Sequence, residues 1–416
     1  MNSRPTVPRA RLALLLGGLA MFGPFAIDTM FPAFPVIEGE FAVSAVAMQQ
    51  TISVYLIAYA LMSVFHGPMS DAAGRKPVIL WGVAVFALAS VGCALAADLP
   101  QLLMFRALQG VSAGAGLIVG RAIIRDCLDG DDAQRLMSHI TMIFGLAPAI
   151  APVVGGWILG WSDWRTIFWF LTAFSILLLA LTAVWLPETH PPQARIALQL
   201  RTLYHGNRAI LSNRQFLLLA SAGSFNFGAL FLYIASAPAF VLDMLKLNAQ
   251  QFGWFFIPMI SGMMFGAFLS GRLAGRLSGA QSAGLGFALC ALAMGWNLAY
   301  CALVDTPSAP WAVLPMALNA VGIALVFPIL TLAILDMYPR QRGAASSMQA
   351  FVGLSFNAVL AGAVSPWASQ SAMRLALVAA GFCIMAGTLW RLYRREVKRE
   401  PGTSAANAAL EPTEQL

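Results

Sequence analysis

The ten residues "GPMSDAAGRK", from Gly67 to Lys76, stand between two strongly apolar segments, residues 46–66 and 77–97. A related stretch, "GRLAGRLSG" from Gly271 to Gly279, follows another apolar segment 204 positions later, which is about half the chain. Gly275 takes the place of Asp71 in this second copy. An offset of this size is expected for parallel structural repeats within one membrane protein. The two halves of the chain are therefore predicted to share one architecture.

Composition places the chain in a lipid bilayer. Of its 416 residues 59% are hydrophobic and only 10% are charged, and the mean hydropathy is +0.75. Soluble domains carry about 25% charged residues. Apolar windows of membrane length recur along the chain, and they are continuous rather than alternating, which predicts an all-α membrane protein and not a barrel. The twelve predicted spans are 12–33, 46–66, 77–97, 100–123, 136–160, 164–186, 215–238, 250–274, 282–304, 309–335, 343–366 and 372–393.

Lysine and arginine positions predict the orientation. With both termini in the cytoplasm, 21 of the 25 basic residues fall inside, three fall outside (Arg165, Lys246, Arg374) and Arg106 lies within a span. This bias predicts a multi-pass protein of the cytoplasmic membrane with both ends inside. The first span has the positive start of a signal peptide but is too long, so we expect it to be retained as an anchor. The net charge of +7 is thereby attributed to topology, and nucleic acid is not expected as a partner.

The longest break between spans, Pro187 to Arg214, carries prolines and four arginines. It is predicted to be a cytoplasmic linker between an N-terminal six-helix bundle, residues 1–186, and a C-terminal one, residues 215–393. The small, polar residues near the end predict a cytoplasmic, disordered tail over residues 394–416.

The sequence lacks motifs that mark several kinds of enzyme and ATP-driven transporter. The sequence has no HExxH or GxxxxGK stretch and no paired carboxylates within a span, which argues against an intramembrane enzyme and against ATP-driven transport. Five dispersed cysteines predict neither a disulfide framework nor a metal site. They are Cys93, Cys127, Cys290, Cys301 and Cys383.

One acid stands alone inside the membrane. Asp28, in "AIDTMFPAFP" (Ala26 to Pro35), is the only carboxylate placed in the middle of a predicted span. Such a charge costs about 3 kcal/mol on insertion scales and usually marks a functional site, although a packing role is the alternative. Asp28 lies about 10 Å from the outer end of its span and Arg106 about 9 Å from the outer end of the fourth. The two are therefore predicted to lie at one level.

These stretches together resemble the major facilitator superfamily, and within it the drug:proton antiporters with twelve spans, specifically the bicyclomycin and chloramphenicol resistance (Bcr/CflA) proteins. The resemblance extends to Arg399 and includes "LPET" (Leu186 to Thr189) at the end of the sixth span. Ala151 stands where the antiporter motif usually has glycine. The matching motif residues are Gly67, Asp71, Gly74, Arg75 and Lys76 in the loop, Arg106, Gln109 and Gly110 in the fourth span, and Gly145, Pro148, Pro152, Gly155 and Gly156 in the fifth.

The resemblance implies a major facilitator fold of two six-helix bundles and alternating-access export of small amphipathic antibiotics, of bicyclomycin, chloramphenicol or florfenicol type. The proton gradient would drive export without a cofactor or metal, with Asp28 and Arg106 meeting at the proton site of a monomer in a bacterial inner membrane. Proton-coupled transport of a metabolite, such as an amino acid or small peptide, remains the alternative, and an intramembrane enzyme the remote one.

Each motif also has a physical interpretation. Gly67 and Gly74 are expected in a tight turn and the loop is expected to latch the cytoplasmic side, although a purely topogenic basic turn is the alternative. The prolines and glycines of the fifth span predict a bend and close helix approach, either for gating or for packing alone. Candidate residues for a substrate cavity are Gln50, Tyr55, Tyr59, Asn226, Phe227, Tyr233, Asn319, Phe327, Gln349 and Asn357.

Overall fold

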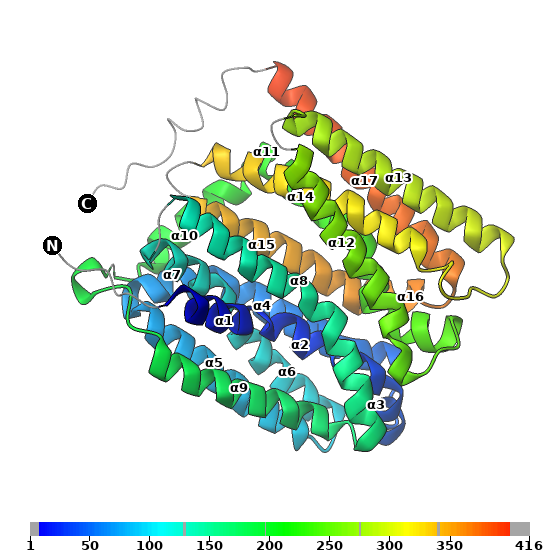
Figure 1. The fold of residues 1–416 in the computed structure, drawn as a ribbon, viewed down its shortest axis with the longest axis horizontal. Coiled ribbons are helices and arrows are strands. Elements are labelled where there is room, and N and C mark those ends of the chain that lie inside the picture. Colours follow the sequence, from blue (N-terminus) through cyan, green and yellow to red (C-terminus); the bar gives the residue numbers. More distant parts are fainter. Residues whose placement is uncertain (1–7, 128–129, 196, 274–275, 339–341, 400–416) are drawn as a thin grey trace. The chain divides into compact units, whose positions relative to one another are not determined.

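The computed structural model describes residues 8–127, 130–195, 197–273, 276–338 and 342–399. The described chain is almost wholly helical (Figure 1). Eleven helical segments in it are long and apolar enough to cross a membrane, and they fall on eleven of the twelve predicted spans. The remaining prediction, the fifth span, falls on the 32-residue helix α8 (Gly130–Trp161). The all-α membrane fold is confirmed.

The N-terminal half contains interrupted as well as continuous spans. The first span is built from four consecutive pieces and the fourth from three, whereas the second, third, fifth and sixth are single helices. The elements are α1 (Arg9–Ala20), α2 (Phe22–Asp28), η1 (Phe31–Ala33) and α3 (Phe34–Phe41); α4 (Ala45–Ala73); α5 (Arg75–Ala94); α6 (Leu99–Gly114), the π-helix η2 (Ala115–Val119) and α7 (Gly120–Cys127); α8; and α9 (Arg165–Trp185).

The C-terminal half repeats the pattern of long helices. Two further π-helices, η4 and η6, lie next to its seventh and eleventh spans. The elements are η3 (Pro192–Ala194), α10 (Leu200–Leu211), α11 (Arg214–Ala235), η4 (Ala239–Met244), η5 (Ala249–Gln251), α12 (Gly253–Leu273), α13 (Gly279–Leu303), α14 (Leu314–Met337), α15 (Arg342–Val359), η6 (Leu360–Val364), α16 (Ser365–Ala368) and α17 (Ala372–Arg399).

By their contacts these elements form two compact units. Unit 1 comprises Met1–Leu198 together with Ala235–Ile260 and Ala358–Trp367, and unit 2 comprises Gln199–Ile234, Ser261–Asn357 and Ala368–Leu416. In unit 1, α5 packs against α9 and α6, and α4 packs against α6 (Figure 1). In unit 2, α13 packs against α14 and α17. Two short segments from the second half of the sequence therefore belong to unit 1.

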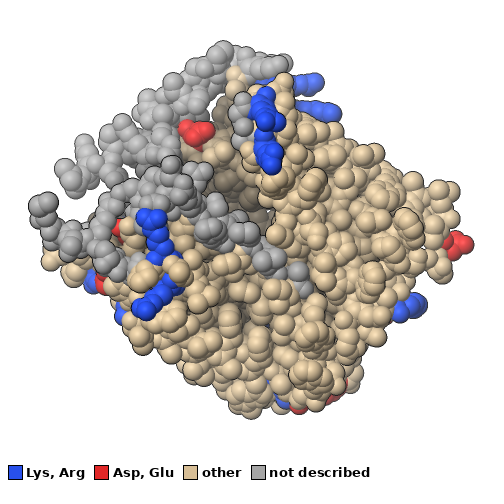
Figure 2. Space-filling model, viewed as in Figure 1, with Lys and Arg blue, Asp and Glu red and all other residues tan. Residues whose placement is uncertain are grey.

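Large apolar side chains cover much of the surface. Leu88 is 69% exposed and Ile384 is 71% exposed, which would be unfavourable in water but suits contact with lipid tails. On the face shown in Figure 2, most of the visible surface comes from residues other than Lys, Arg, Asp and Glu. The helices are thus apolar both where they pack together and where they face outward, as expected in a bilayer.

Two local expectations are wrong, and the predicted linker is partly helical. Gly67 does not lie in a turn, because α4 continues as a helix to Ala73 and only Gly74 separates it from α5. The predicted linker contains a 12-residue helix, α10, which its prolines and arginines concealed. Residues 394–399, expected in the disordered tail, continue α17, and residues 400–416 lie outside the described chain.

Candidate functional site

Arg106 on α6 is the centre of a buried polar site in unit 1. Its side chain is 0% exposed. Nε and Nη1 donate to backbone carbonyls and a side-chain amide, and Nη2 has no hydrogen-bond partner among the described residues. Nη1 donates to the Ala26 carbonyl at 2.7 Å and to Gln109 Oε1 at 2.8 Å, and Nε donates to the Thr51 carbonyl at 3.3 Å. The guanidinium also lies over the ring of Tyr55, with Cζ 4.6 Å from the centroid. Arg106 thereby ties α6 to α2 and α4.

Asp28 lies at the last residue of α2, two positions after the carbonyl that Arg106 holds. It is 4% exposed, and within the described residues no hydrogen bond or ion pair engages its carboxylate. The direct pairing with Arg106 that we expected is therefore not formed. The carbonyls of Ala26 and Thr51 take the guanidinium donors instead, because buried carbonyls also require partners.

Tyr55 connects the two charged residues. Its hydroxyl is in electrostatic range of both Asp28 and Arg106, and its oxygen has no hydrogen-bond partner among the described residues. Asp28 and Arg106 therefore both lie near Tyr55, and their common level in the membrane stays a prediction. A movement of α2 by a few ångströms would be enough to alter the field that Asp28 experiences.

The rest of the fourth-span motif supports this site. Gln109 accepts from Arg106 and donates through Nε2 to Ser90 Oγ on α5 at 2.8 Å. Gly110 lies against α4 so closely that a Cβ at this position would stand 2.2 Å from the Tyr55 carbonyl oxygen. The motif therefore sets the orientation of the arginine and the spacing of the helices that hold it.

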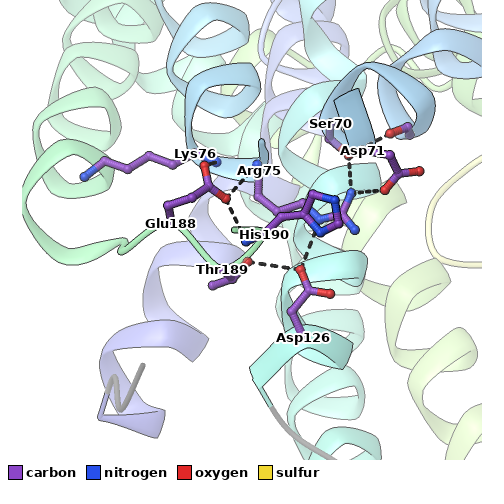
Figure 3. A network of polar contacts seen from close by, with 9 residues as sticks. Ser70, Asp71, Arg75, Lys76, Asp126, Glu188, Thr189 and His190 are labelled. Carbon is purple, nitrogen blue, oxygen red and sulfur yellow. Dashed lines mark hydrogen bonds and ion pairs between the residues drawn. The ribbon is translucent and has the colours of Figure 1, made fainter. Parts of the chain in front are cut away.

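A second polar site lies where α4 meets α5 (Figure 3). The buried Arg75 donates through Nε to Asp126 Oδ2 at 3.0 Å and through Nη1 to both Ser70 Oγ at 2.6 Å and Asp71 Oδ1 at 2.5 Å. Thr189 donates to the same oxygen of Asp126 at 3.0 Å. One arginine thus joins the end of α4, the end of α7 and the segment after α9.

Glu188, from "LPET", caps the start of α5. Its carboxylate accepts the backbone N–H groups of Arg75 at 3.0 Å and Lys76 at 3.3 Å, where the helix dipole favours negative charge. Lys76 Nζ in turn donates to the Ala183 carbonyl near the end of α9 at 2.8 Å. Gly74 permits this arrangement, because its φ is +104° and a Cβ there would stand 2.5 Å from Glu188 Oε2.

Sequence reasoning identified Arg75, Asp71 and Lys76 but missed their partners Ser70, Asp126 and Glu188. A signal was present for two of them. Asp126 and Glu188 are acids at the ends of the fourth and sixth spans, on the same predicted side as the basic loop. Ser70 carries no such signal, since serine is common in membrane helices.

The antiporter motif lies on α8, a continuous helix in which Pro152 is buried and Pro148 is half-buried. Gly145 lies outside the residues whose burial the structure describes. A Cβ on Gly155 would meet the Thr29 carbonyl oxygen at 1.9 Å, and a Cβ on Gly156 would meet the Ala249 carbonyl oxygen at 2.2 Å. The close helix approach predicted for these glycines is confirmed.

Three of the ten candidate cavity residues lie in unit 1 and seven in unit 2. In unit 1, Gln50 donates to the Gly362 carbonyl at 2.9 Å, Tyr55 lies under Arg106, and Tyr59 lies beside Gly114. A role in binding substrate stays a prediction for all ten.

In unit 2 several of the candidate side chains contact other side chains of that unit. Asn226 Oδ1 lies 3.6 Å from Cys290 Sγ, and Tyr233 Oη accepts from Asn297 Nδ2 at 2.7 Å, so both face α13. The remaining five are distributed differently: Asn319 and Asn357 are buried, Phe227 stacks on Phe231, Gln349 donates to Thr331 Oγ1 at 3.0 Å, and Phe327 is 43% exposed.

Long apolar helices around a buried arginine, with a basic network at one end, define a multi-pass membrane transporter. The chain belongs to the Major Facilitator Superfamily, whose profile matches residues 14–355. It is accordingly a transporter and not an enzyme.

Among curated relatives, a bicyclomycin resistance protein homolog of Haemophilus influenzae is 29% identical over 380 residues, covering 90% of this chain and 94% of that protein. Multidrug resistance protein D of Escherichia coli is 27% identical, with the same coverage of both chains. An uncharacterized MFS-type transporter of Bacillus subtilis is 35% identical over 64% of this chain and 66% of its own length.

Solved structures agree on the fold. A bacterial homolog of the human lysosomal transporter Spinster, inward-facing and occupied, matches with a TM-score of 0.74 at 18% identity, covering 93% of this chain and 97% of that one. A D-xylose–proton symporter matches with a TM-score of 0.70 at 15% identity, covering 92% and 97%. The predicted major facilitator fold is confirmed.

Proposed function

We propose that this protein exports small antibiotics across a bacterial inner membrane in exchange for protons, with both termini in the cytoplasm. Asp28 carries the proton, and the observation that carries the proposal is its burial without a partner beside the Arg106–Tyr55 group. An acid in this position exchanges its proton as neighbouring helices move, because burial favours the neutral form and an arginine nearby favours the charged one.

The names of the relatives support drugs as cargo. Two of them are called a bicyclomycin resistance protein homolog and a multidrug resistance protein. We extend this to bicyclomycin and to chloramphenicol or florfenicol as substrates here. A small amphipathic molecule suits a mostly apolar pocket with few polar anchors, for which the ten predicted cavity residues remain our candidates.

Alternating access would move two bundles, residues 1–186 and 215–393, about the linker 187–214. Contacts that such a movement must break are present within unit 1. Ser53 Oγ donates to the Ala358 carbonyl at 2.8 Å, Gln50 Nε2 to the Gly362 carbonyl at 2.9 Å, and Gly156 packs on Ala249. At the cytoplasmic end, the Arg75 network lies within the N-terminal bundle. We propose that it holds the ends of that bundle's helices together during the movement.

Purified protein in liposomes tests the function. A pH gradient, acidic on the side that represents the outside, should drive uphill movement of chloramphenicol or bicyclomycin, and a pump-deficient bacterial strain expressing the chain should gain resistance to the same drugs. Flux of amino acids or peptides without drug flux would support the metabolite alternative and reject the proposal.

A further inference from the structure

His66 on α4 is a buried titratable residue that has no role in the sites above. It is 0% exposed and lies seven residues before the end of α4, a helix long and apolar enough to span a membrane. Its two ring nitrogens lie near the backbone of Met62 and Val111, but neither completes a hydrogen bond among the described residues. An ionisable side chain inside a span is costly and is retained where it has a function.

His66 belongs to a stripe of polar residues along one face of α4. Thr51, Tyr55, Tyr59, His66 and Ser70 are separated by four, four, seven and four positions, a spacing that places all five on the same side of a helix. The Thr51 carbonyl accepts from Arg106 at one end of the stripe, and Ser70 Oγ accepts from Arg75 at the other. The polar stripe therefore connects the Asp28 site with the loop network.

Two glycines of α6 face the polar stripe. A Cβ on Gly110 would touch the Tyr55 carbonyl, and a Cβ on Gly114 would stand 2.8 Å from Tyr59 Cε2 and 3.0 Å from His66 Nδ1. These last two atoms are therefore at most about 6 Å apart, by the two distances to that shared point. The π-helix η2 begins directly after Gly114, and π-helices inside longer helices often accompany functional sites.

The stripe has free hydrogen-bonding capacity in an apolar environment. Tyr55 Oη and both nitrogens of His66 have no partner in the described part of the chain. Proteins meet such a need with ordered water in most cases. Water bridging these side chains would complete a hydrogen-bonded path of about 16 Å from Tyr55 to His66, at 1.5 Å per residue.

Few other titratable groups lie around His66. On α4 itself these are Tyr55, Tyr59 and Asp71. From neighbouring helices, α6 contributes Arg106, α7 contributes Asp126 and Arg121, which is in electrostatic range of Tyr59, and α5 contributes Lys76 and Arg75, which pairs with both aspartates. The sequences of η2 and η6, which also pack on α4, contain none, and the glutamates of α3 (Glu38 and Glu40) lie beside the opposite end of α4. His66 is thus the one imidazole on the stripe.

We propose that His66 relays protons between Asp28 and the cytoplasmic end of α4. The Asp28 O–H bond breaks and its proton moves through the Tyr55 and Tyr59 hydroxyls and ordered water to one ring nitrogen of His66, forming an imidazolium. The opposite nitrogen then releases a proton to water near Ser70, and the neutral ring returns. No oxidant or second substrate takes part. This inference rests on the proposed function, because it assigns the route of the proton that Asp28 carries.

The test separates proton movement from drug movement in liposomes, with chloramphenicol as the probe. A chloramphenicol gradient should drive proton flux, read by an internal pH dye, while labelled chloramphenicol exchanges for unlabelled drug at equal pH without needing the relay. His66→Gln should lower the drug-driven proton flux by about tenfold or more, since a positioned proton-transfer group contributes on the order of 10²–10⁴-fold, and leave drug exchange within about twofold. Free imidazole should restore proton flux to His66→Ala.

Ser63→Ala is the matched control, because Ser63 is equally buried on α4 but its hydroxyl donates to the Ala60 carbonyl of the same helix at 2.7 Å. It should keep both fluxes. Equal loss of proton flux and drug exchange in His66→Gln would mean a structural role and overturn the relay, as would unchanged proton flux. Absence of coupled proton flux in the wild-type protein would instead reject the proposed function itself.

Discussion

Unit 1 and unit 2 are built from similar long apolar helices but differ in what they bury. Unit 1 buries Asp28, Arg75, Arg106 and His66. Apart from aromatic residues and cysteines, the polar residues buried in the described part of unit 2 are neutral serines and asparagines. Because a charge inside a membrane is costly, such groups persist only where they are used. The difference teaches that a duplicated architecture need not carry duplicated chemistry. Under the proposed function, the proton carrier belongs to unit 1.

The same contrast appears in how matching helices begin. α13, which follows the second copy of the repeat, is capped by its own Ser278, whose side chain accepts from Gln281 N at 3.3 Å while Gln281 Oε1 accepts from Ser278 N at 2.9 Å. α5, which follows the first copy, has no local side-chain cap and depends on Glu188, which follows the sixth span. In unit 2 the start of α13 is capped by neighbouring residues, whereas in unit 1 the start of α5 is capped by a residue far away in sequence.

Removing the buried acid of unit 1 gives the largest expected effect. Asp28→Asn should insert and fold, yet lose pH-driven uphill drug export by about 100-fold or more, because the amide cannot carry a proton. Asp98→Asn, which alters an exposed acid at the start of α6, is the matched control and should transport normally. Undiminished uphill export by Asp28→Asn would break the assignment of proton handling to unit 1.

A membrane potential sharpens the comparison next. If Asp28 is the only proton carrier, one proton enters for each drug leaving, so a neutral drug moves one net charge and a monovalent cationic drug moves none. Each 100 mV is worth about 2.3 kcal/mol per charge, or about fiftyfold in the gradient of a neutral drug. Imposing the potential with potassium and valinomycin in liposomes should accelerate export of the neutral drug alone. Equal stimulation of both drugs would reveal a second carrier, for which unit 2 would have to be searched.

Glycine substitutions test whether unit 1 needs its close helix contacts. Gly110→Ala forces a Cβ against the Tyr55 carbonyl and should cost about 1–3 kcal/mol of stability and weaken transport, because it moves the helices that hold Arg106. Gly67→Ala is the control, since nothing lies within 4 Å of its Cβ position and alanine favours a helix. Thermal unfolding in detergent measures both. A destabilised Gly67→Ala with an unaffected Gly110→Ala would contradict the packing described.

The two helix caps give the smallest expected effect. Glu188→Ala and Ser278→Ala should each lower stability by about 1 kcal/mol, as loss of an N-cap generally does. Only Glu188→Ala should also slow drug turnover, by a few-fold, because it loosens the network around Arg75. Turnover slowed equally by both substitutions would show that the caps act through stability alone.

The sequence predicted the fold well because membrane spans are long and their composition is extreme. Continuous apolar segments marked the helices, and Asp28 and Arg106 stood out because charges are rare there. The helix α10 was missed because its arginines and the prolines before it are typical of a loop. The partners of Arg106 were mispredicted for another reason: two of them are backbone carbonyls, those of Ala26 near the end of α2 and Thr51 within α4, and every residue type has a carbonyl.

Other partners depended on packing that spacing alone does not give. Residue type alone suggested a cavity for Asn226 and Tyr233, and it could not reveal their contacts with Cys290 and Asn297 on α13. Gly155 and Gly156 were predicted correctly as contact points, whereas the carbonyls that they meet, Thr29 and Ala249, come from segments far away in sequence.

The cap that Glu188 places on α5 also bears on how the protein is made. Arg75 leaves the ribosome 113 residues before the carboxylate that completes its helix, an interval on the order of ten seconds at ordinary rates of synthesis. Until then the N–H groups at the start of α5 lack the carboxylate that accepts from them, and the contact between α5 and the end of the sixth span has not formed. α13 needs only three more residues for its own cap. The first six spans are therefore expected to mature together, as a single late event, whereas the later spans acquire their order one at a time.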